Sequence, residues 1–149
     1  MRGLMTLMAL AAIVVACTGT TERQEVADEI AHALAESFLQ PLQELAHGGT
    51  NSGDDTSEIL DKLVDQTLDE LPPPPGVRRL MEGRGVGIHQ EADTAWATTT
   101  VVVVPSSDPS EPYCVAVGVH SDGRVEATHS SGEPLDPCSG ANYIDFDRQ

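Results

Sequence analysis

The sequence predicts an α+β fold in which an N-terminal pair of amphipathic helices packs on a small antiparallel β-meander. Three observations support this fold class. Up to residue 71, apolar residues recur every three or four positions, which is the spacing of one helix face. Beyond Pro72–Pro75 the chain becomes rich in β-branched residues that alternate with other types, which is typical of strands. Cys114 and Cys138 lie in this second part and can cross-link it with one disulfide.

The first 16 residues have the features of a secretory signal peptide. Leu4–Ala16 is an apolar segment of 13 residues. As a helix it would measure roughly 20 Å, against a hydrocarbon core of roughly 30 Å, so it is too short to span a membrane comfortably. Arg2 precedes the segment, and small residues followed by Cys17 end it. The sequence therefore predicts export of the chain and removal of residues 1–16.

The tetrapeptide Val14-Val15-Ala16-Cys17 resembles the lipobox of bacterial lipoproteins. In that family the cysteine is thioether-linked to a diacylglyceryl group and becomes the new N-terminus. The resemblance therefore implies lipidation of Cys17 and attachment to the extracytoplasmic face of the cell membrane, where two acyl chains give a stable anchor. An ordinary cleaved signal is the alternative, because Val14 and Ala16 also suit a general signal peptidase. That form would leave Cys17 as a free thiol.

Once Cys17 carries a lipid, only Cys114 and Cys138 remain. In an exported chain, two leftover cysteines most simply form one disulfide. The bridge would close a loop of 25 residues, for which chain entropy gives about 3 to 4 kcal/mol of stabilisation. Metal ligation by the two thiolates is the alternative. It is disfavoured because their spacing is far from the C-x-x-C of structural zinc sites.

The first predicted helix follows a polar tether at residues 17–21, with Thr21 as its cap. We expect Pro41 to kink this helix or to begin a second short one, and Gly48-Gly49 to end it. Its apolar stripe comprises Val26, Ile30, Leu34, Phe38, Leu42 and Leu45. Such stripes usually form core, so we expect the helix to pack against the rest of the chain; an open docking face for a partner is the alternative.

A second helix should begin at Asp55 or Thr56 and end before the four prolines, which should form an extended segment. Glu58 and Lys62 are spaced for an exposed ion pair one turn apart. The predicted apolar face comprises Ile59, Leu60, Leu63, Val64, Leu68 and Leu71.

Short strands are expected in the second half of the chain. Residues 76–83 are predicted to form a helical turn or an irregular segment. The unbroken run Val101–Val104 predicts burial of both faces at that end of its strand. The predicted strands are a short one at Val86 and Ile88 with a turn at Glu91–Asp93, a long one at Trp96–Val104, a hairpin that starts with Tyr113–Ser121, and an edge strand at Tyr143–Phe146.

The register of the hairpin can be predicted from its turn. A three-residue turn at Ser121–Gly123, with the glycine in the left-handed conformation of a bulge, pairs Val119 with Val125. A two-residue turn would instead set polar residues against the valine face. In the bulged register Cys114 points to the opposite face. The loop at residues 130–137 must then carry the second cysteine back across that face.

Charge and length favour one acidic domain. The chain has a formal net charge of −16, and the loss of Arg2 with the signal makes it −17. Such a surface should repel nucleic acid and anionic headgroups, which favours either a basic partner, such as a basic envelope protein, or a merely solvating role for the charge. The predicted organisation is a signal at 1–16, the lipidated cysteine and tether at 17–21, an acidic helical region at 22–71, a polyproline linker at 72–76 and a β region at 77–149.

No motif assigns a reaction. The segment Gly83–Gly87 has Ile88 where G-x-G-x-x-G needs glycine, and no Walker pattern occurs. His120 and His129 fall on opposite faces of the predicted hairpin, and the five histidines never occur as H-x-x-x-H. The pair Asp145 and Asp147 offers too few oxygens for calcium. We therefore expect no metal or other cofactor.

The sequence thus predicts a membrane-anchored lipoprotein that acts as a non-catalytic binding or scaffolding module in the cell envelope. Two alternatives remain open at this point. One is an envelope hydrolase or metal-dependent enzyme. The other is a small-molecule carrier, which would need a cavity between the helices and the sheet.

Overall fold

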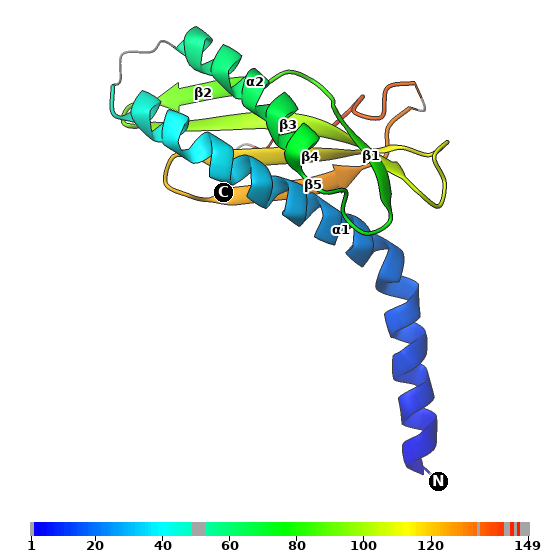
Figure 1. Ribbon diagram of the computed structural model, residues 1–149. Coiled ribbons are helices and arrows are strands. Elements are labelled where there is room, and N and C mark those ends of the chain that lie inside the picture. The colour runs from blue at the N-terminus through cyan, green and yellow to red at the C-terminus, as the bar shows by residue number, and fades with distance from the viewer. Residues whose placement is uncertain (1, 49–52, 134, 142–143, 145, 147–149) are drawn as a thin grey trace.

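The computed structural model describes residues 2–48, 53–133, 135–141, 144 and 146, with side chains from Glu22 onward. Two helices, α1 (Arg2–Ala46) and α2 (Gly53–Glu70), cover one face of a five-stranded antiparallel sheet (Figure 1). The strands are β1 (Val77–Glu82), β2 (Gly87–Glu91), β3 (Thr94–Pro105), β4 (Tyr113–His120) and β5 (Val125–Ser130). The predicted α+β class and the packing of helices on the sheet are confirmed.

Helix α1 is longer and more continuous than the sequence pattern predicted. Its backbone is already helical from Arg2, so the predicted start at Thr21 is wrong. Residues 4–16 are rich in leucine, methionine and alanine, which are good helix formers, and the helical backbone continues from them through the polar residues 17–21. Pro41 lies inside α1 and begins no second helix, and its neighbour Leu42 is fully buried in the core. The helix ends at Ala46.

Helix α2 begins at Gly53, two residues before the first predicted cap, so Asp55 and Thr56 lie in its first turns. Leu60 and Val64 are fully buried, whereas Ile59 is 39% exposed and does not belong to the buried face. The predicted ion pair is present, with Lys62 Nζ 3.8 Å from a Glu58 carboxylate oxygen. Both partners are exposed, so this pair contributes little to stability.

The sheet has the order β1-β3-β4-β5, and β2 also pairs with β3. Strand β1 pairs with the end of β3 at Val101–Pro105, while β2 pairs with its beginning at Thr94–Thr98. Two short strands therefore lie end to end along one side of the long β3. Helix α2 packs over β1 and β2, and α1 packs over β3, β4 and β5.

Strand β1 corrects the prediction for residues 76–83. The sequence Val77–Glu82 contains Arg78-Arg79, which interrupts the alternation that identifies a strand. The register shifts between Val77 and Arg79, so a bulge accommodates the adjacent arginines. Pairing with β3 then fixes the strand despite its weak local pattern.

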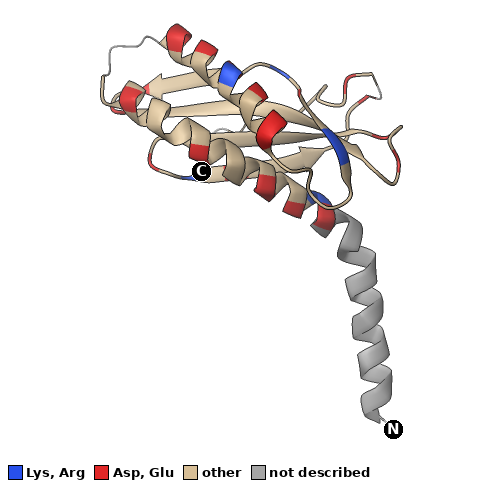
Figure 2. Ribbon diagram, viewed as in Figure 1, with Lys and Arg blue, Asp and Glu red and all other residues tan. Residues whose placement is uncertain are grey.

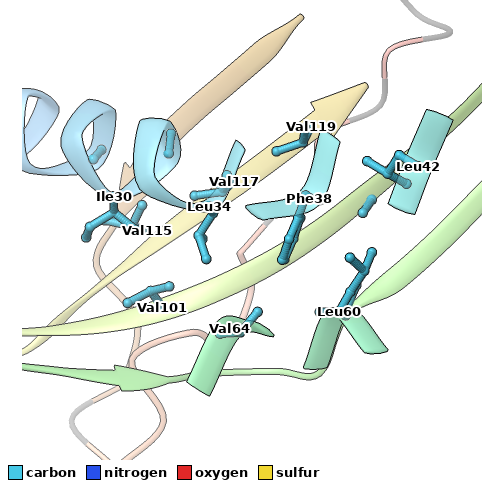
Figure 3. Close-up of a cluster of buried hydrophobic side chains, with 14 of the residues drawn as sticks. Ile30, Leu34, Phe38, Leu42, Leu60, Val64, Val101, Val115, Val117 and Val119 are labelled. Atoms are coloured by element: carbon cyan, nitrogen blue, oxygen red, sulfur yellow. The ribbon is translucent and has the colours of Figure 1, made fainter. Parts of the chain in front are cut away.

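The core lies between the helices and the sheet (Figure 3). All six residues of the predicted α1 stripe are buried, and Phe38 is fully enclosed. They meet the valine face of the sheet, which includes Val101, Val115 and Val117. The interpretation of the α1 stripe as core is therefore correct, and this stripe is not an open docking face.

The hairpin has the predicted bulged register. Val119 lies opposite Val125 and Val117 opposite Ala127. Gly123 has a φ of +95°, in the left-handed region that a bulged turn requires. A side chain at this position would strain the backbone, so glycine determines which face of β5 the apolar residues occupy.

The second face of the sheet is covered by the C-terminal part of the chain. Cys114 and Cys138 form a disulfide with their Cα atoms 4.9 Å apart, and the bridge lies in a small cluster with Val102 on this face. Ile144 packs with Trp96 in a smaller apolar cluster. Two of the four residues of the predicted edge strand at Tyr143–Phe146, at positions 143 and 145, lie outside the described residues, and the two that are described, Ile144 and Phe146, do not belong to a strand.

Candidate functional site

The described surface is dominated by carboxylates on the outer sides of the two helices (Figure 2). Between Glu22 and Glu70 there are 13 acidic residues and two basic ones, and every acidic residue except Asp61 is exposed. On α1, Glu25, Glu29 and Glu36 recur at intervals of four and seven residues and so lie along one outward-facing line. We call these three residues the α1 acidic line.

The two basic residues of this region do not neutralise the α1 acidic line. Arg23 lies over the ring of Tyr113, with its guanidinium carbon 4.6 Å from the ring centroid, and donates a hydrogen bond to Ser131. Lys62 pairs with Glu58 on the other helix. The face that points away from the sheet therefore carries a nearly uniform negative charge, which attracts cations and repels anions.

A cleft of about 390 Å³ lies beside Arg23, where α1 meets the end of the sheet. Its walls mix apolar residues, such as Val26 and Val77, with Glu22 and Glu111. Burial raises the pKa of Tyr113 on this wall, although the positive charge of Arg23 acts in the opposite direction. Acids outnumber bases here as well.

Three carboxyl groups meet where α2 crosses β1. Glu82 is the last residue of β1 and lies opposite Val101, so its side chain shares the helix-covered face of the sheet. Asp65 and Asp61 on α2 are its acidic neighbours. Burial, followed by the bond to Asp65 and the negative charges of both aspartates, raises the pKa of Glu82 to about 7. Sequence spacing gave no sign of this contact, because it joins two elements through tertiary packing.

The glycine-rich segment Gly83–Gly87 has a structural role. It spans the gap between β1 and β2, and Arg84 N donates a hydrogen bond of 2.6 Å to Thr100 Oγ1. A β-carbon on Gly83 would lie 2.9 Å from Cys138 Sγ, so only glycine fits beside the disulfide. Helix α2 holds the segment at Val86, whose N–H donates to Asp61 and whose carbonyl accepts from Ser57.

The histidines form no metal site. His89, Trp96 and His120 are cross-strand neighbours on the outer face, with ring centroids 5.2 Å and 5.8 Å apart in a continuous stack. His129 is on the opposite face, in edge contact with Tyr113, as the hairpin register predicted. Within the part of the chain that the structure describes, no three His, Cys, Asp or Glu side chains are placed to hold a metal ion.

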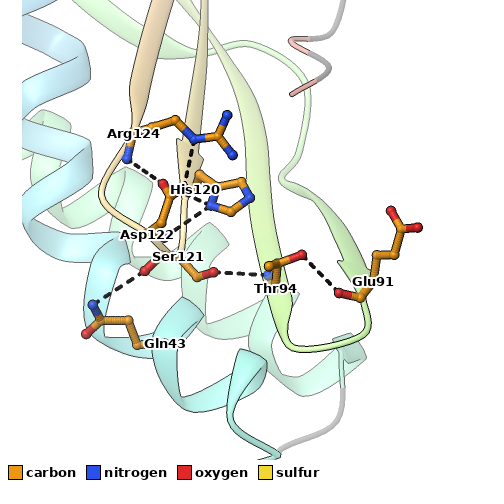
Figure 4. A network of polar contacts seen from close by, with 8 residues as sticks. Gln43, Glu91, Thr94, His120, Ser121, Asp122 and Arg124 are labelled. Carbon is orange, nitrogen blue, oxygen red and sulfur yellow. Dashed lines mark hydrogen bonds and ion pairs between the residues drawn. The ribbon is translucent and has the colours of Figure 1, made fainter. Parts of the chain in front are cut away.

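The hairpin end of the sheet is closed by a polar network (Figure 4). Asp122 bonds to the backbone N–H and the Nε of Arg124, and His120 Nδ1 accepts from Asp122 N. The hydroxyl of Ser121 accepts from Ala95 N, and its carbonyl accepts from the Gln43 side chain of α1. These bonds satisfy polar groups of the turn and connect the turn to α1 through Gln43.

The predicted lipidation site cannot be placed, because the side chain of Cys17 lies outside the described residues. The predicted disulfide is present. Asp145 and Asp147 also lie outside the described residues. None of the helices, over their described residues, is long and apolar enough to cross a membrane. No family model, no curated protein and no solved structure matches this chain.

Proposed function

We propose that the protein is a lipoprotein of the cell envelope, anchored through a diacylglyceryl group at Cys17, that acts as a non-catalytic binding module for a basic partner. The lipobox resemblance at Val14–Cys17 supports the anchor. The charge of the helix layer supports the choice of partner. A cationic protein surface gains favourable Coulomb energy and is steered toward such a face, whereas nucleic acid is repelled.

The observation that carries the proposal is that α1 has one apolar face packed in the core and one acidic face exposed to solvent. The apolar stripe is buried in the core, and every exposed residue of α1 among those whose side chains are described is polar or charged. The α1 acidic line faces away from the sheet and has no basic residue of the described chain paired with it. Binding here should therefore be electrostatic and sensitive to salt.

The proposal predicts that neutralising the α1 acidic line abolishes partner binding. The experiment compares the wild-type protein with the triple variant E25Q/E29Q/E36Q, each immobilised and exposed to detergent-solubilised envelope extract. A bound protein should be retained by the wild type and released as NaCl rises from about 0.15 M to about 0.5 M, because the screening length shrinks. The triple variant should retain little of it.

The matched control is E111Q/E126Q/E133Q, which removes three negative charges from the sheet and its loops. Because it has the same net charge as the first variant, it separates a local surface from a general charge effect. Equal loss of binding in both variants, or capture that does not depend on salt, would contradict the proposal. Turnover by the purified protein on a panel of hydrolase substrates would favour the enzyme alternative.

A further inference from the structure

We propose that the cleft beside Arg23 is a binding site for a small organic cation, a guanidinium group on an aliphatic stem, whose charge meets the carboxylates of the cleft while its stem lies on the apolar wall. The inference is independent of the partner proposed above, because no residue of the α1 acidic line lines this cleft.

The cleft lies between three segments that hydrogen bonds and packing hold in place. Helix α1 supplies the first wall through Val26, which is buried in the core. The residues that follow the four prolines supply the second wall, where Val77 N donates to the Pro74 carbonyl at 3.0 Å. The Gly76 carbonyl accepts from Ser106 N at 2.9 Å, which joins this wall to the third, the loop between β3 and β4. Because the walls are held before a ligand arrives, binding costs little ordering of the chain.

The size and the apolar lining of the cleft suit a small molecule. Its volume of about 390 Å³ lies within the range of roughly 300–1,000 Å³ that is typical of ligand sites. Val26 and Val77 are buried on two of its walls, and Pro75 and Pro105 complete the apolar lining. An aliphatic stem placed against these residues is removed from water, which favours binding. The ligand should therefore have an apolar part as well as a charge.

The charge of the cleft favours a cation. Three of the residues that line it carry carboxylates and are exposed, namely Glu22, Asp108 and Glu111. Within the described part of the chain, none of these carboxylates forms an ion pair. The one basic residue of the lining is Arg23, and its guanidinium lies over the ring of Tyr113. The cleft therefore has a net negative charge and attracts positively charged ligands.

A hydroxyl group without a partner gives an independent indication of a ligand. Tyr113 lines the cleft, and only 4% of the residue is exposed. Its pKa is shifted by burial and by the charges of Arg23 and Glu22, and no hydrogen bond to another described residue contributes. Buried polar groups in folded proteins are nearly always hydrogen-bonded, so this hydroxyl needs a partner that the described chain does not supply. An N–H group of a bound guanidinium can donate to its oxygen.

The proposal predicts that the protein binds Nα-acetyl-arginine amide better than Nα-acetyl-citrulline amide, a neutral compound of nearly the same shape. Each compound is added separately to the isotope-labelled full chain, and the backbone amides are followed by NMR. The arginine compound should cause saturable shifts in the residues that line the cleft, such as Gly76, Val77 and Ser107. The citrulline compound should bind about tenfold more weakly, because its hydrogen bonds to the carboxylates are not charge-assisted.

Two variants and a matched control test the location of the site. E22Q/E111Q should weaken binding of the arginine compound by about tenfold, whereas E44Q/E91Q should change it by less than about twofold. The control removes the same charge from the other end of α1 and from the end of β2. Tyr113→Phe keeps the aromatic ring and removes only the hydroxyl, so it should weaken binding by about fivefold.

Equal binding of the arginine and citrulline compounds, or saturable binding of Nα-acetyl-glutamate amide, would overturn the proposal. Binding that is unchanged in E22Q/E111Q or in Tyr113→Phe would overturn it as well, and so would the absence of saturable shifts in the cleft. The capture experiment on the α1 acidic line is a separate test, because these variants leave the three glutamates of that line in place.

Discussion

Replacing Phe38 with alanine is expected to lower the free energy of unfolding by about 3 to 5 kcal/mol. Phe38 is fully buried where α1 faces both α2 and the sheet. Truncation removes the burial of an aromatic ring and leaves a cavity that the surrounding valines and leucines cannot fill without moving the helix. Because a domain of this size has a total stability of roughly 5 to 15 kcal/mol, the variant should be close to unfolding.

Urea denaturation followed by circular dichroism measures this loss directly. The control is Ile59→Ala on α2, which should change the stability by no more than about 0.5 kcal/mol because Ile59 is substantially exposed. A Phe38→Ala protein as stable as the wild type would mean that α1 does not pack on the sheet in solution. The stripe would then have to be reconsidered as a docking face.

Loss of the disulfide should have the second largest effect. Cys114→Ser is expected to lower the free energy of unfolding by about 3 to 4 kcal/mol, because the unfolded chain regains the freedom of the loop closed by Cys114–Cys138. Reduction of the wild-type protein should lower the melting temperature by a similar amount. The measurement is thermal unfolding of both proteins with and without a thiol reductant.

The variant itself supplies the control for this experiment. Reductant should have no further effect on Cys114→Ser, since its only bridge among the described residues is already absent. If the native wild-type protein instead shows two free thiols at Cys114 and Cys138, or if reductant leaves its melting temperature unchanged, the cross-link does not contribute to stability.

Much of the fold could be predicted because its signals are local. The bulged turn of the hairpin followed from requiring the valines of β4 to face Val125 and Ala127, and that requirement depends only on residues close in sequence. The α1 stripe was visible because helical periodicity extends over five turns. The disulfide followed from counting cysteines in a chain for which the sequence predicts export.

Strand β1 was missed because adjacent arginines obscured its alternation, and only its pairing with β3 reveals it. The start of α1 was wrong because a polar run was interpreted as a helix boundary although the helical backbone continues through it. The proximity of Glu82 to Asp61 and Asp65 could not be predicted, because these residues belong to different elements and their spacing in the sequence follows no helix or strand periodicity. The acidity of the helical region was predictable from its composition, and the structure places its carboxylates on the outward side of the two helices.

The central claim is the allocation of the three thiols, with Cys17 bound to lipid and Cys114 bonded to Cys138. Intact mass spectrometry of the protein purified from its native membrane tests this claim most directly. The account predicts a chain that begins at Cys17, carries the added mass of a diacylglyceryl group and gains two hydrogens on reduction. An N-terminus that still contains residues 1–16 and carries no acyl chains would contradict it.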